Sequence, residues 1–304
     1  MKIANNVLEL IGHTPIVSLN RIVPEQASNV YVKLEGFNPG GSIKDRPGLY
    51  MLEKAEALGE LKPDSIILEA TSGNTGIGLA MAASLKGYPL VIVMPENMSE
   101  ERKKILKAYG AQLILTSASE GMPGAVKRAQ SMAQLDDRYF LVKQFENPAN
   151  AECHEISTAR EILEQMEHID ALVCGVGSGG TITGIARVLK QKIPEVKIIA
   201  VEPEKSAVLS GSTAGFHKIQ GIGAGFIPEI LNFELIDGII PVQDEEAILT
   251  CRKLARHEAL LLGISSGAVI FAAIQLATEW GKGKKILAIA ADSADKYMST
   301  EIFD

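Results

Sequence analysis

Cysteine is scarce in this sequence, and its few cysteines argue against two kinds of site. The 304-residue chain contains three, Cys153, Cys174 and Cys251, which lie far apart. Their odd number does not suit a disulfide framework, and their spacing matches no metal-ligand motif. We therefore expect three reduced cysteines in the core and no metal site.

Long apolar runs and blocks of like charge are also missing. No apolar run approaches the ~20 residues that a membrane-spanning helix needs, and the segment from Met1 to Leu10 lacks the basic and apolar regions of a secretory signal. A net charge of −7 without a basic block argues against nucleic acid as the main partner. These absences predict a cytoplasmic protein that binds neither membrane nor nucleic acid.

Short β-branched runs alternate with turns and helices from residue 65 onward. Strands are predicted at 66–68, 90–94, 112–115, 171–174, 197–201 and 285–290, with helices between them, including one from Pro148 to about Met166. The run 171–174 is apolar throughout, as a strand buried on both faces requires. The pattern predicts an α/β fold of parallel sheets covered by helices on both faces. The region 204–236 breaks this rhythm, and we expect it to border the functional site.

One stretch, Asn38 to Gly48, places a lysine where a helix begins. The residues 39–41 (Pro-Gly-Gly) exclude a regular strand, Ser42 can cap a helix, and Pro47 suits a first helical turn. The positive partial charge of a helix N-terminus disfavours a second positive charge, which biases the Lys44 amine toward its neutral, nucleophilic form. A lone lysine in a turn is more often a surface residue, so this assignment depends on the rest of the chain.

Three further loops follow predicted strands or precede predicted helices, where open α/β sheets bind ligands. The glycine loop 175–181 can direct backbone N–H groups at an anion. It lacks the Gly-Lys-Ser/Thr ending of a nucleotide P-loop, and only Glu202 is near the position of a ribose-binding acid. Loop 71–75 offers hydroxyls, an amide and free helix N–H groups to a small carboxylate, and loop 263–267 places a hydroxyl at a helix start. Each loop alone is equally explained as a cap or tight turn.

Together these motifs resemble the pyridoxal-phosphate enzymes of the tryptophan synthase β-like fold and, within them, the cysteine synthases (O-acetylserine sulfhydrylases). The resemblance spans nearly the whole chain. It is carried, in family order, by residues 9–15, 33–35, 38–48, 71–78, 143–150, 175–181, 221–228 and 265–267. It implies the fold type II architecture of two open parallel-sheet domains. A smaller, mobile N-terminal domain would comprise residues 38–147, and residues 1–37 and 148–304 would form the larger domain that binds the cofactor phosphate.

The resemblance also implies roles for individual residues. Lys44 would bind pyridoxal 5'-phosphate covalently and, once displaced by the substrate amine, take the substrate's α-proton. The other cofactor contacts would be Asn74 to the ring oxygen, Ser265 to the pyridine nitrogen, and Gly177, Ser178, Gly179, Gly180 and Thr181 to the phosphate. The substrate carboxylate would be held by Thr71, Ser72, Thr75 and Gln144, with Gly221 in the loop at the mouth of the site.

The implied reaction is a β-replacement that forms L-cysteine from O-acetyl-L-serine and sulfide and releases acetate. A hydroxyl at Ser265 cannot keep the ring nitrogen protonated as a carboxylate would, which favours elimination at Cβ over transamination. By resemblance the enzyme is a homodimer, and serine acetyltransferase is a possible partner.

Other readings remain open at the level of sequence. Ala151, the pair Ala159-Arg160 and residues 291–297 depart from the family pattern, which leaves the choice of acceptor less certain. A relative that uses homocysteine or cysteine, forming cystathionine or lanthionine with sulfide release, is one alternative. A nucleotide-binding dehydrogenase that uses the Gly177 loop is a second, and a non-catalytic partner protein is a third.

Overall fold

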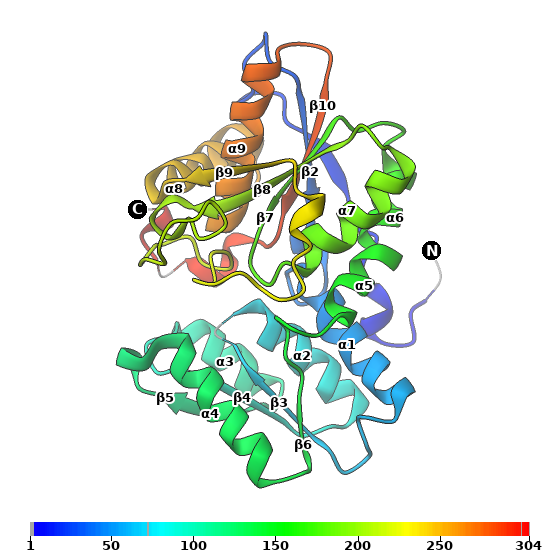
Figure 1. Cartoon of the computed structure of the whole chain (residues 1–304), viewed down its shortest axis with the longest axis vertical. Coiled ribbons are helices and arrows are strands. Elements are labelled where there is room, and N and C mark those ends of the chain that lie inside the picture. Colours follow the sequence, from blue (N-terminus) through cyan, green and yellow to red (C-terminus); the bar gives the residue numbers. More distant parts are fainter. Residues whose placement is uncertain (1–2, 72, 299, 304) are drawn as a thin grey trace.

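Two separate β-sheets form the framework of the chain (Figure 1). The computed structural model describes residues 3–71, 73–298 and 300–303. One sheet has six strands in the order β1-β2-β10-β7-β8-β9, and the other has four in the order β5-β4-β3-β6. Among the described strands, neighbours run parallel except for β1 and β2, which pair antiparallel at one edge. The predicted α/β class with parallel sheets is confirmed.

The larger sheet combines the N-terminal and C-terminal parts of the chain, and the smaller sheet uses the part between them. The strands of the larger sheet are β1 (Ile16–Ser18), β2 (Asn29–Leu34), β7 (Ala171–Gly175), β8 (Lys197–Pro203), β9 (Gly238–Val242) and β10 (Lys285–Ala290). Those of the smaller sheet are β3 (Ile66–Ala70), β4 (Leu90–Pro95), β5 (Gln112–Thr116) and β6 (Tyr139–Leu141).

Helices cover both faces of each sheet. They are α1 (Asp45–Leu58), α2 (Asn74–Lys86), α3 (Glu100–Ala108), α4 (Gly121–Leu135), α5 (Ala149–Ile156), α6 (Thr158–Gln165), α7 (Gly180–Lys192), α8 (Asp244–Lys253) and α9 (Ile264–Trp280). Strand β7 shows why the sequence of such a strand is apolar throughout. Ala171 and Val173 pack into the core under α9, whereas Leu172 and Cys174 pack into the core under α7. Alternate side chains of one strand thus fill two cores.

The helix predicted from Pro148 to about Met166 is instead two helices, α5 and α6. The break lies at Ser157, whose φ of −119° and ψ of −80° are not helical. The Ser157 hydroxyl donates to the carbonyl of Cys153, four residues earlier, and such side-chain bonding bends helices. The sequence prediction of a single helix was wrong at this residue.

The region 204–236, every residue of which is described, contains two short 3-10 turns, at Glu204–Ser206 and Phe233–Leu235. The remaining connections include 3-10 turns at Val7–Leu10, Glu35–Phe37, Ala118–Glu120, Ala294–Tyr297 and Glu301–Phe303, and a π turn at Leu254–Glu258. Within the described part of the chain, no helix combines the length and apolar character that crossing a membrane requires.

Candidate active site

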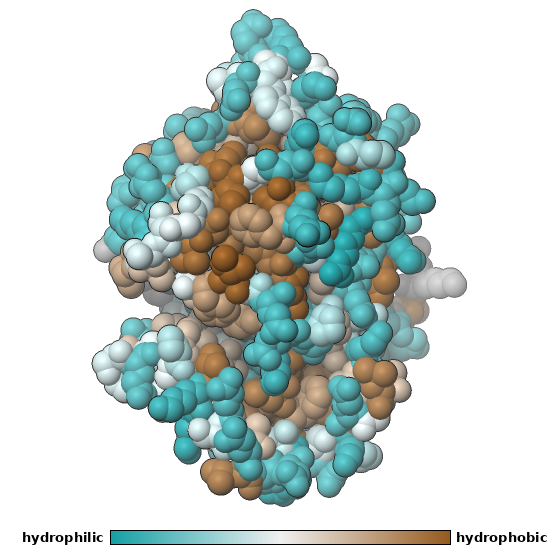
Figure 2. All heavy atoms as spheres, in the orientation of Figure 1, coloured by the Kyte–Doolittle hydropathy of each residue, from teal (hydrophilic) through white to brown (hydrophobic). Residues whose placement is uncertain are grey.

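A cavity of about 1360 Å³ is lined by residues from the loops and helices of both sheets. Apolar side chains gather in the middle of the face shown in Figure 2, and polar ones cover most of its upper end. Residues 214–229 line part of the cavity, so the irregular region borders it as predicted. The cavity-lining residues that the sequence singled out are Lys44, Thr71, Asn74, Thr75, Gln144, Gly177, Ser178, Gly179, Thr181, Gly221 and Ser265. Gly180 is buried at the first residue of α7, and Ser72 lies outside the described residues.

Lys44 occupies the N-cap position of α1, where the sequence placed it. Its side chain lines the cavity, and its amine has no hydrogen bond or ion pair with any residue that the structure describes. Burial lowers the pKa of this amine, and the negative groups nearby, including Asp292, only partly oppose the shift. The direction of this shift agrees with the expected bias toward the neutral amine, and desolvation is its largest cause.

Two glycines fix the backbone around Lys44. A Cβ on Gly78 of α2 would lie 2.5 Å from the Lys44 carbonyl oxygen, and one on Gly48 of α1 would lie 2.7 Å from the Gly78 carbonyl carbon. Because neither distance is possible for a real side chain, glycine at both positions lets α1 and α2 meet at Lys44. From the other side, the N–H of Ile43 donates to the carbonyl of Ala291 at 2.8 Å.

Arg46, two residues beyond Lys44, anchors the same helix in a buried ion-pair cluster. Its guanidinium lies 2.7 Å from Glu35 and 2.6 Å from Glu161 of α6, and Lys33 of β2 lies 2.9 Å from Glu161. Burial alone would lower the pKa of Arg46, but the two carboxylates outweigh it and raise the pKa. Burial would likewise raise the pKa of Glu161, yet Arg46 and Lys33 hold it at about 2. Two cations and two carboxylates therefore compensate one another, an arrangement the sequence analysis missed.

The glycine loop between β7 and α7 has the shape of an anion site. Gly179 has a φ of +84°, and a Cβ on Gly180 would lie 2.3 Å from Asn150 Oδ1. Asn150 Nδ2 donates to Ser178 Oγ at 3.0 Å and so ties α5 to the loop. The first N–H groups of α7 have no partner within the helix, and a phosphate is the kind of group that such a terminus binds.

His154 is a further neighbour of this loop. Its Nε2 lies 3.2 Å from Thr181 Oγ1, and its Nδ1 lies 2.9 Å from Thr158 Oγ1. Burial, aided by the positive charges of Lys44 and Arg46, holds the pKa of His154 well below its usual value. No role for this histidine was predicted from the sequence; in the structure it is a neutral support for Thr181.

The candidate carboxylate site is assembled from α2 and the turn after β6. Thr75 Oγ1 donates to Gln144 Oε1 at 2.7 Å. The buried carboxylate of Glu69, at the end of β3, accepts the N–H groups of Lys143 at 2.9 Å and Gln144 at 3.4 Å. Burial raises the pKa of Glu69 to about 7. Glu69, also missed from sequence, holds the turn in which Lys143 has a positive φ of 58°.

Asn74 and Ser265 reach the cavity from the first turns of α2 and α9. Asn74 Nδ2 donates to Asp292 Oδ2 at 2.7 Å. Ser265 is 3% exposed, and its hydroxyl is a neutral hydrogen-bond partner at the cavity wall. Gly221, with a φ of +98°, is next to this residue, since a Cβ added there would lie 3.6 Å from Ser265 Oγ.

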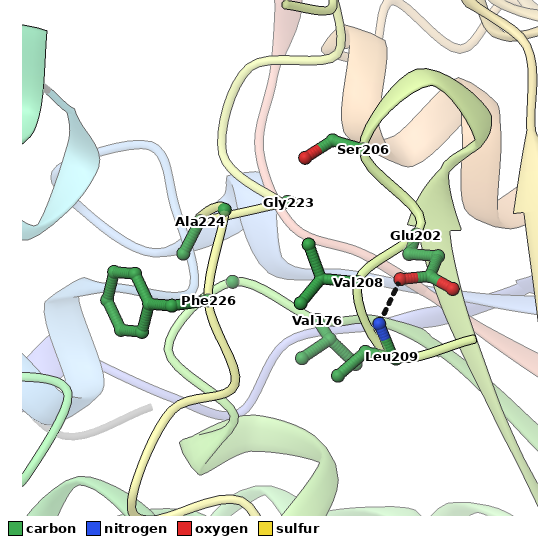
Figure 3. Close-up of a pocket in the computed structure, with 10 residues that line it drawn as sticks. Val176, Glu202, Ser206, Val208, Leu209, Gly223, Ala224 and Phe226 are labelled. Carbon is green, nitrogen blue, oxygen red and sulfur yellow. Dashed lines mark hydrogen bonds between the residues drawn. The ribbon is translucent and has the colours of Figure 1, made fainter. Parts of the chain in front are cut away.

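A second, much smaller cavity of about 10 Å³ is lined in part by the loop 223–226 (Figure 3). Glu202 lines it, and the Glu202 carboxylate accepts the N–H groups of Leu209 at 2.8 Å and Ser210 at 3.0 Å. The Ser210 hydroxyl donates to the same carboxylate at 2.6 Å. Glu202 is therefore committed to its own loop, which argues against its service as the ribose-binding acid of a dinucleotide site.

The donor set of the large cavity fits pyridoxal phosphate. It contains an amine that has no counter-ion among the described residues and could bind the aldehyde, a helix N-terminus with hydroxyls for the phosphate, and a neutral hydroxyl for the ring nitrogen. Asn74 Oδ1 and Asn150 Oδ1 are buried without a partner among the described residues, as polar atoms often are at functional sites.

Comparisons with known proteins agree with this reading. A family model described as pyridoxal-phosphate dependent enzyme matches residues 7–292. A cysteine synthase of Staphylococcus aureus (strain Mu50) is 51% identical over 304 residues, covering 99% of this chain and 98% of that protein. The crystal structure of a cysteine synthase from Entamoeba histolytica has a TM-score of 0.95 at 43% identity, covering 99% of this chain and 91% of that one. A hydrogen sulfide-producing enzyme from Fusobacterium nucleatum has a TM-score of 0.94 at 44% identity, covering 97% and 100%. The chain belongs to the family of pyridoxal-phosphate-dependent enzymes.

Proposed function

We propose that this enzyme forms L-cysteine from O-acetyl-L-serine and sulfide, with release of acetate. The observation that carries the proposal is the unpaired Lys44 amine in the same cavity as the glycine loop, Ser265 and the Thr75–Gln144 pair. The similarity to cysteine synthases over the full length of the chain supports the choice of substrates.

Each part of the cofactor has a matching group in the cavity. Lys44 would hold its aldehyde carbon, residues 177–181 its phosphate, Asn74 its ring oxygen and Ser265 its ring nitrogen. When bound, pyridoxal phosphate supplies an electron sink for the pair left behind when the α-proton departs. Ser265 is uncharged and leaves the ring nitrogen unprotonated, which moderates that sink and favours loss of the β-substituent.

The substrate carboxylate would bind at the start of α2. Thr71 and Thr75 offer hydroxyls there, and the unpaired N–H groups of the helix favour an anion. Ser72, which lies outside the described residues, is proposed to join them. Gln144 joins this set through its hydrogen bond with Thr75. A fixed carboxylate would orient the α-proton of the substrate. Gly221, in the loop at the mouth of the cavity, has no side chain, so the backbone of this loop could approach the substrate closely.

Lys44 would also accept the α-proton of the substrate. Because burial lowers the pKa of its amine, a larger share of the amine is neutral and able to accept the α-proton as a general base. No acidic side chain is paired with Lys44 among the described residues.

We also propose the larger organisation of the enzyme. Residues 38–147 would form a smaller mobile domain that closes onto a larger domain of residues 1–37 and 148–304, which the separate sheet of β3 to β6 supports. The protein would act as a cytoplasmic homodimer and could bind serine acetyltransferase. Light scattering of the protein alone and mixed with that transferase would test both states.

Assays with alternative acceptors test the proposed reaction. Sulfide, homocysteine and cysteine are compared side by side, each with O-acetylserine and with serine. Cysteine formation from O-acetylserine and sulfide should be fastest. Faster turnover with homocysteine or cysteine would replace the proposal with a cystathionine-forming or hydrogen sulfide-releasing activity.

A further inference from the structure

The C-terminal segment 291–297 joins three elements of the site. Asp292 forms an isolated β-bridge with Ser42, beside Lys44, and its carbonyl accepts the N–H of Gly263 at 3.2 Å, just before α9. Its side chain reaches Asn74 at the first residue of α2. The segment therefore contacts the Lys44 loop and the starts of both α2 and α9.

Within this segment, Asp292 holds a buried carboxylate that commits one oxygen to two donors. Oδ2 accepts from Asn74 Nδ2 at 2.7 Å and from the Tyr297 hydroxyl at 2.6 Å. Oδ1 is buried and has no partner among the described residues. Asp292 is 1% exposed, so water does not compete for these bonds.

The Asp292 carboxylate determines which end of the Asn74 amide is the donor. The two ends of an amide have nearly the same shape but opposite hydrogen-bonding character. Burial raises the pKa of Asp292, and the hydrogen bonds from Tyr297 and Asn74 oppose this shift by stabilising the ionised form. With the carboxyl ionised, a turned-over amide would place Asn74 Oδ1 2.7 Å from Asp292 Oδ2 with no hydrogen between the two oxygens. In the observed orientation Nδ2 keeps a second N–H for another acceptor, and Oδ1 is buried without a partner among the described residues.

We propose that Asp292 is a positioning residue that makes Asn74 present an N–H, and not a carbonyl, to the ring oxygen of the cofactor. The proposal rests on the proposed role of Asn74 in holding that oxygen. Donation from Asn74 favours the anionic form of the ring oxygen, so Asp292 would influence cofactor affinity and the cofactor's absorbance without touching the cofactor.

Titration of the cofactor-free protein with pyridoxal phosphate, followed by absorbance, tests this role. Asp292→Ala should weaken binding about tenfold or more, since one hydrogen bond to a charged group is lost, and should move absorbance toward shorter wavelength. Asp292→Asn keeps one acceptor oxygen and should restore most of both properties. Asp295→Ala is the matched control, because Asp295 is exposed in the same segment and bonds Ser293; it should behave as the wild type.

A double-mutant cycle separates this role from a purely structural one. In an Asn74→Ala background, Asp292→Ala should have no further effect on affinity or absorbance. Additive effects would show that Asp292 acts independently of Asn74 and would overturn the inference. If Asp292→Ala fails to fold, Asp292→Leu, which fills the same space without an acceptor, takes its place in the cycle.

The outcomes also distinguish this inference from the proposed function. A wild-type protein that does not bind pyridoxal phosphate would contradict the proposed function itself. A wild type that binds it, with Asp292→Ala identical in affinity and spectrum, would overturn only the role of Asp292.

Discussion

Lys44 and Arg46 are two cations at the start of one helix, and their surroundings are opposite. The Arg46 guanidinium is held by Glu35 and Glu161 at 2.6–2.7 Å, and its pKa is raised. The Lys44 amine faces a cavity without a counter-ion among the described residues, and its pKa is lowered. One cation is fixed in its charged form, and the other is left able to react.

The difference comes from the segments that pack around each residue. The carboxylates that bind Arg46 come from the 3-10 turn after β2 and from α6, whereas Lys44 lines the cavity together with Cys174 and the glycine loop. A buried pair is costly to break because the remaining charge has no compensation, and a buried unpaired amine is relieved by losing its proton. Of these two residues in one turn, Arg46 therefore contributes to stability and Lys44 to reactivity.

The largest expected effect is on turnover when Lys44 is replaced. Lys44→Ala should still bind pyridoxal phosphate through the glycine loop but should lose about a thousandfold or more in rate with O-acetylserine, because both the covalent attachment and the proton acceptor are absent. Steady-state assays of cysteine formation measure this. A variant with the normal rate would contradict the assignment of Lys44.

The free energy of unfolding should depend more on Arg46 than on Lys44, the reverse of the order expected for turnover. Arg46→Met leaves Glu35 buried without a cation and leaves Glu161 with Lys33 alone, and should cost about 3–5 kcal/mol of unfolding free energy. Lys44→Met removes an unpaired buried amine and should leave the stability of the cofactor-free protein unchanged or higher. Denaturant unfolding of the two variants provides the measurement, and equal losses would remove the distinction between the two cations.

Gln144, an uncharged residue of the cavity, should affect substrate binding more than turnover, in contrast to Lys44. Gln144→Ala leaves Thr75 without its acceptor and should raise the KM for O-acetylserine about tenfold, while kcat changes less. Initial rates over a range of O-acetylserine concentrations give both constants. A lowered kcat with an unchanged KM would place Gln144 in the chemical step instead of in carboxylate binding.

The smallest effect is on the pH dependence of stability. With the folded pKa of Lys44 below its ordinary 10.5, the unfolded chain binds more protons between the two pKa values, so this residue makes stability rise with pH toward 10.5. Lys44→Met should reduce that slope by up to about 1.4 kcal/mol per pH unit. Arg46 stays protonated throughout, so Arg46→Met should change the slope less, and only through Lys33, whose pKa Arg46 lowers. Unfolding of cofactor-free protein at several alkaline pH values tests this, and a slope unaltered by Lys44→Met would contradict the lowered pKa.

Local signals made much of the site predictable from the sequence. Glycines, hydroxyls and prolines around helix starts mark Lys44, the 71–75 loop and the 175–181 loop, because turns and caps depend on residues close together in the chain. The proposed roles of these residues and the domain boundaries remain predictions.

The supports of the site were not predictable in this way. Arg46 and Glu161 are 115 residues apart, and Asn74 and Asp292 are 218 apart, so no short pattern reports either pair. The break at Ser157 was missed for a related reason, since a helix-compatible sequence does not reveal that the Ser157 hydroxyl will bond the Cys153 carbonyl. Glu69 and His154 likewise gain their meaning only from partners brought by folding.

Chemical trapping of the cofactor tests the central claim most directly. The protein loaded with pyridoxal phosphate is reduced with borohydride, which fixes the cofactor to the lysine that holds it, and is digested for peptide mass spectrometry. The account predicts the added mass on the peptide containing Lys44 and its absence in Lys44→Ala. Labelling of another lysine in the wild type, or no labelling at all, would contradict it.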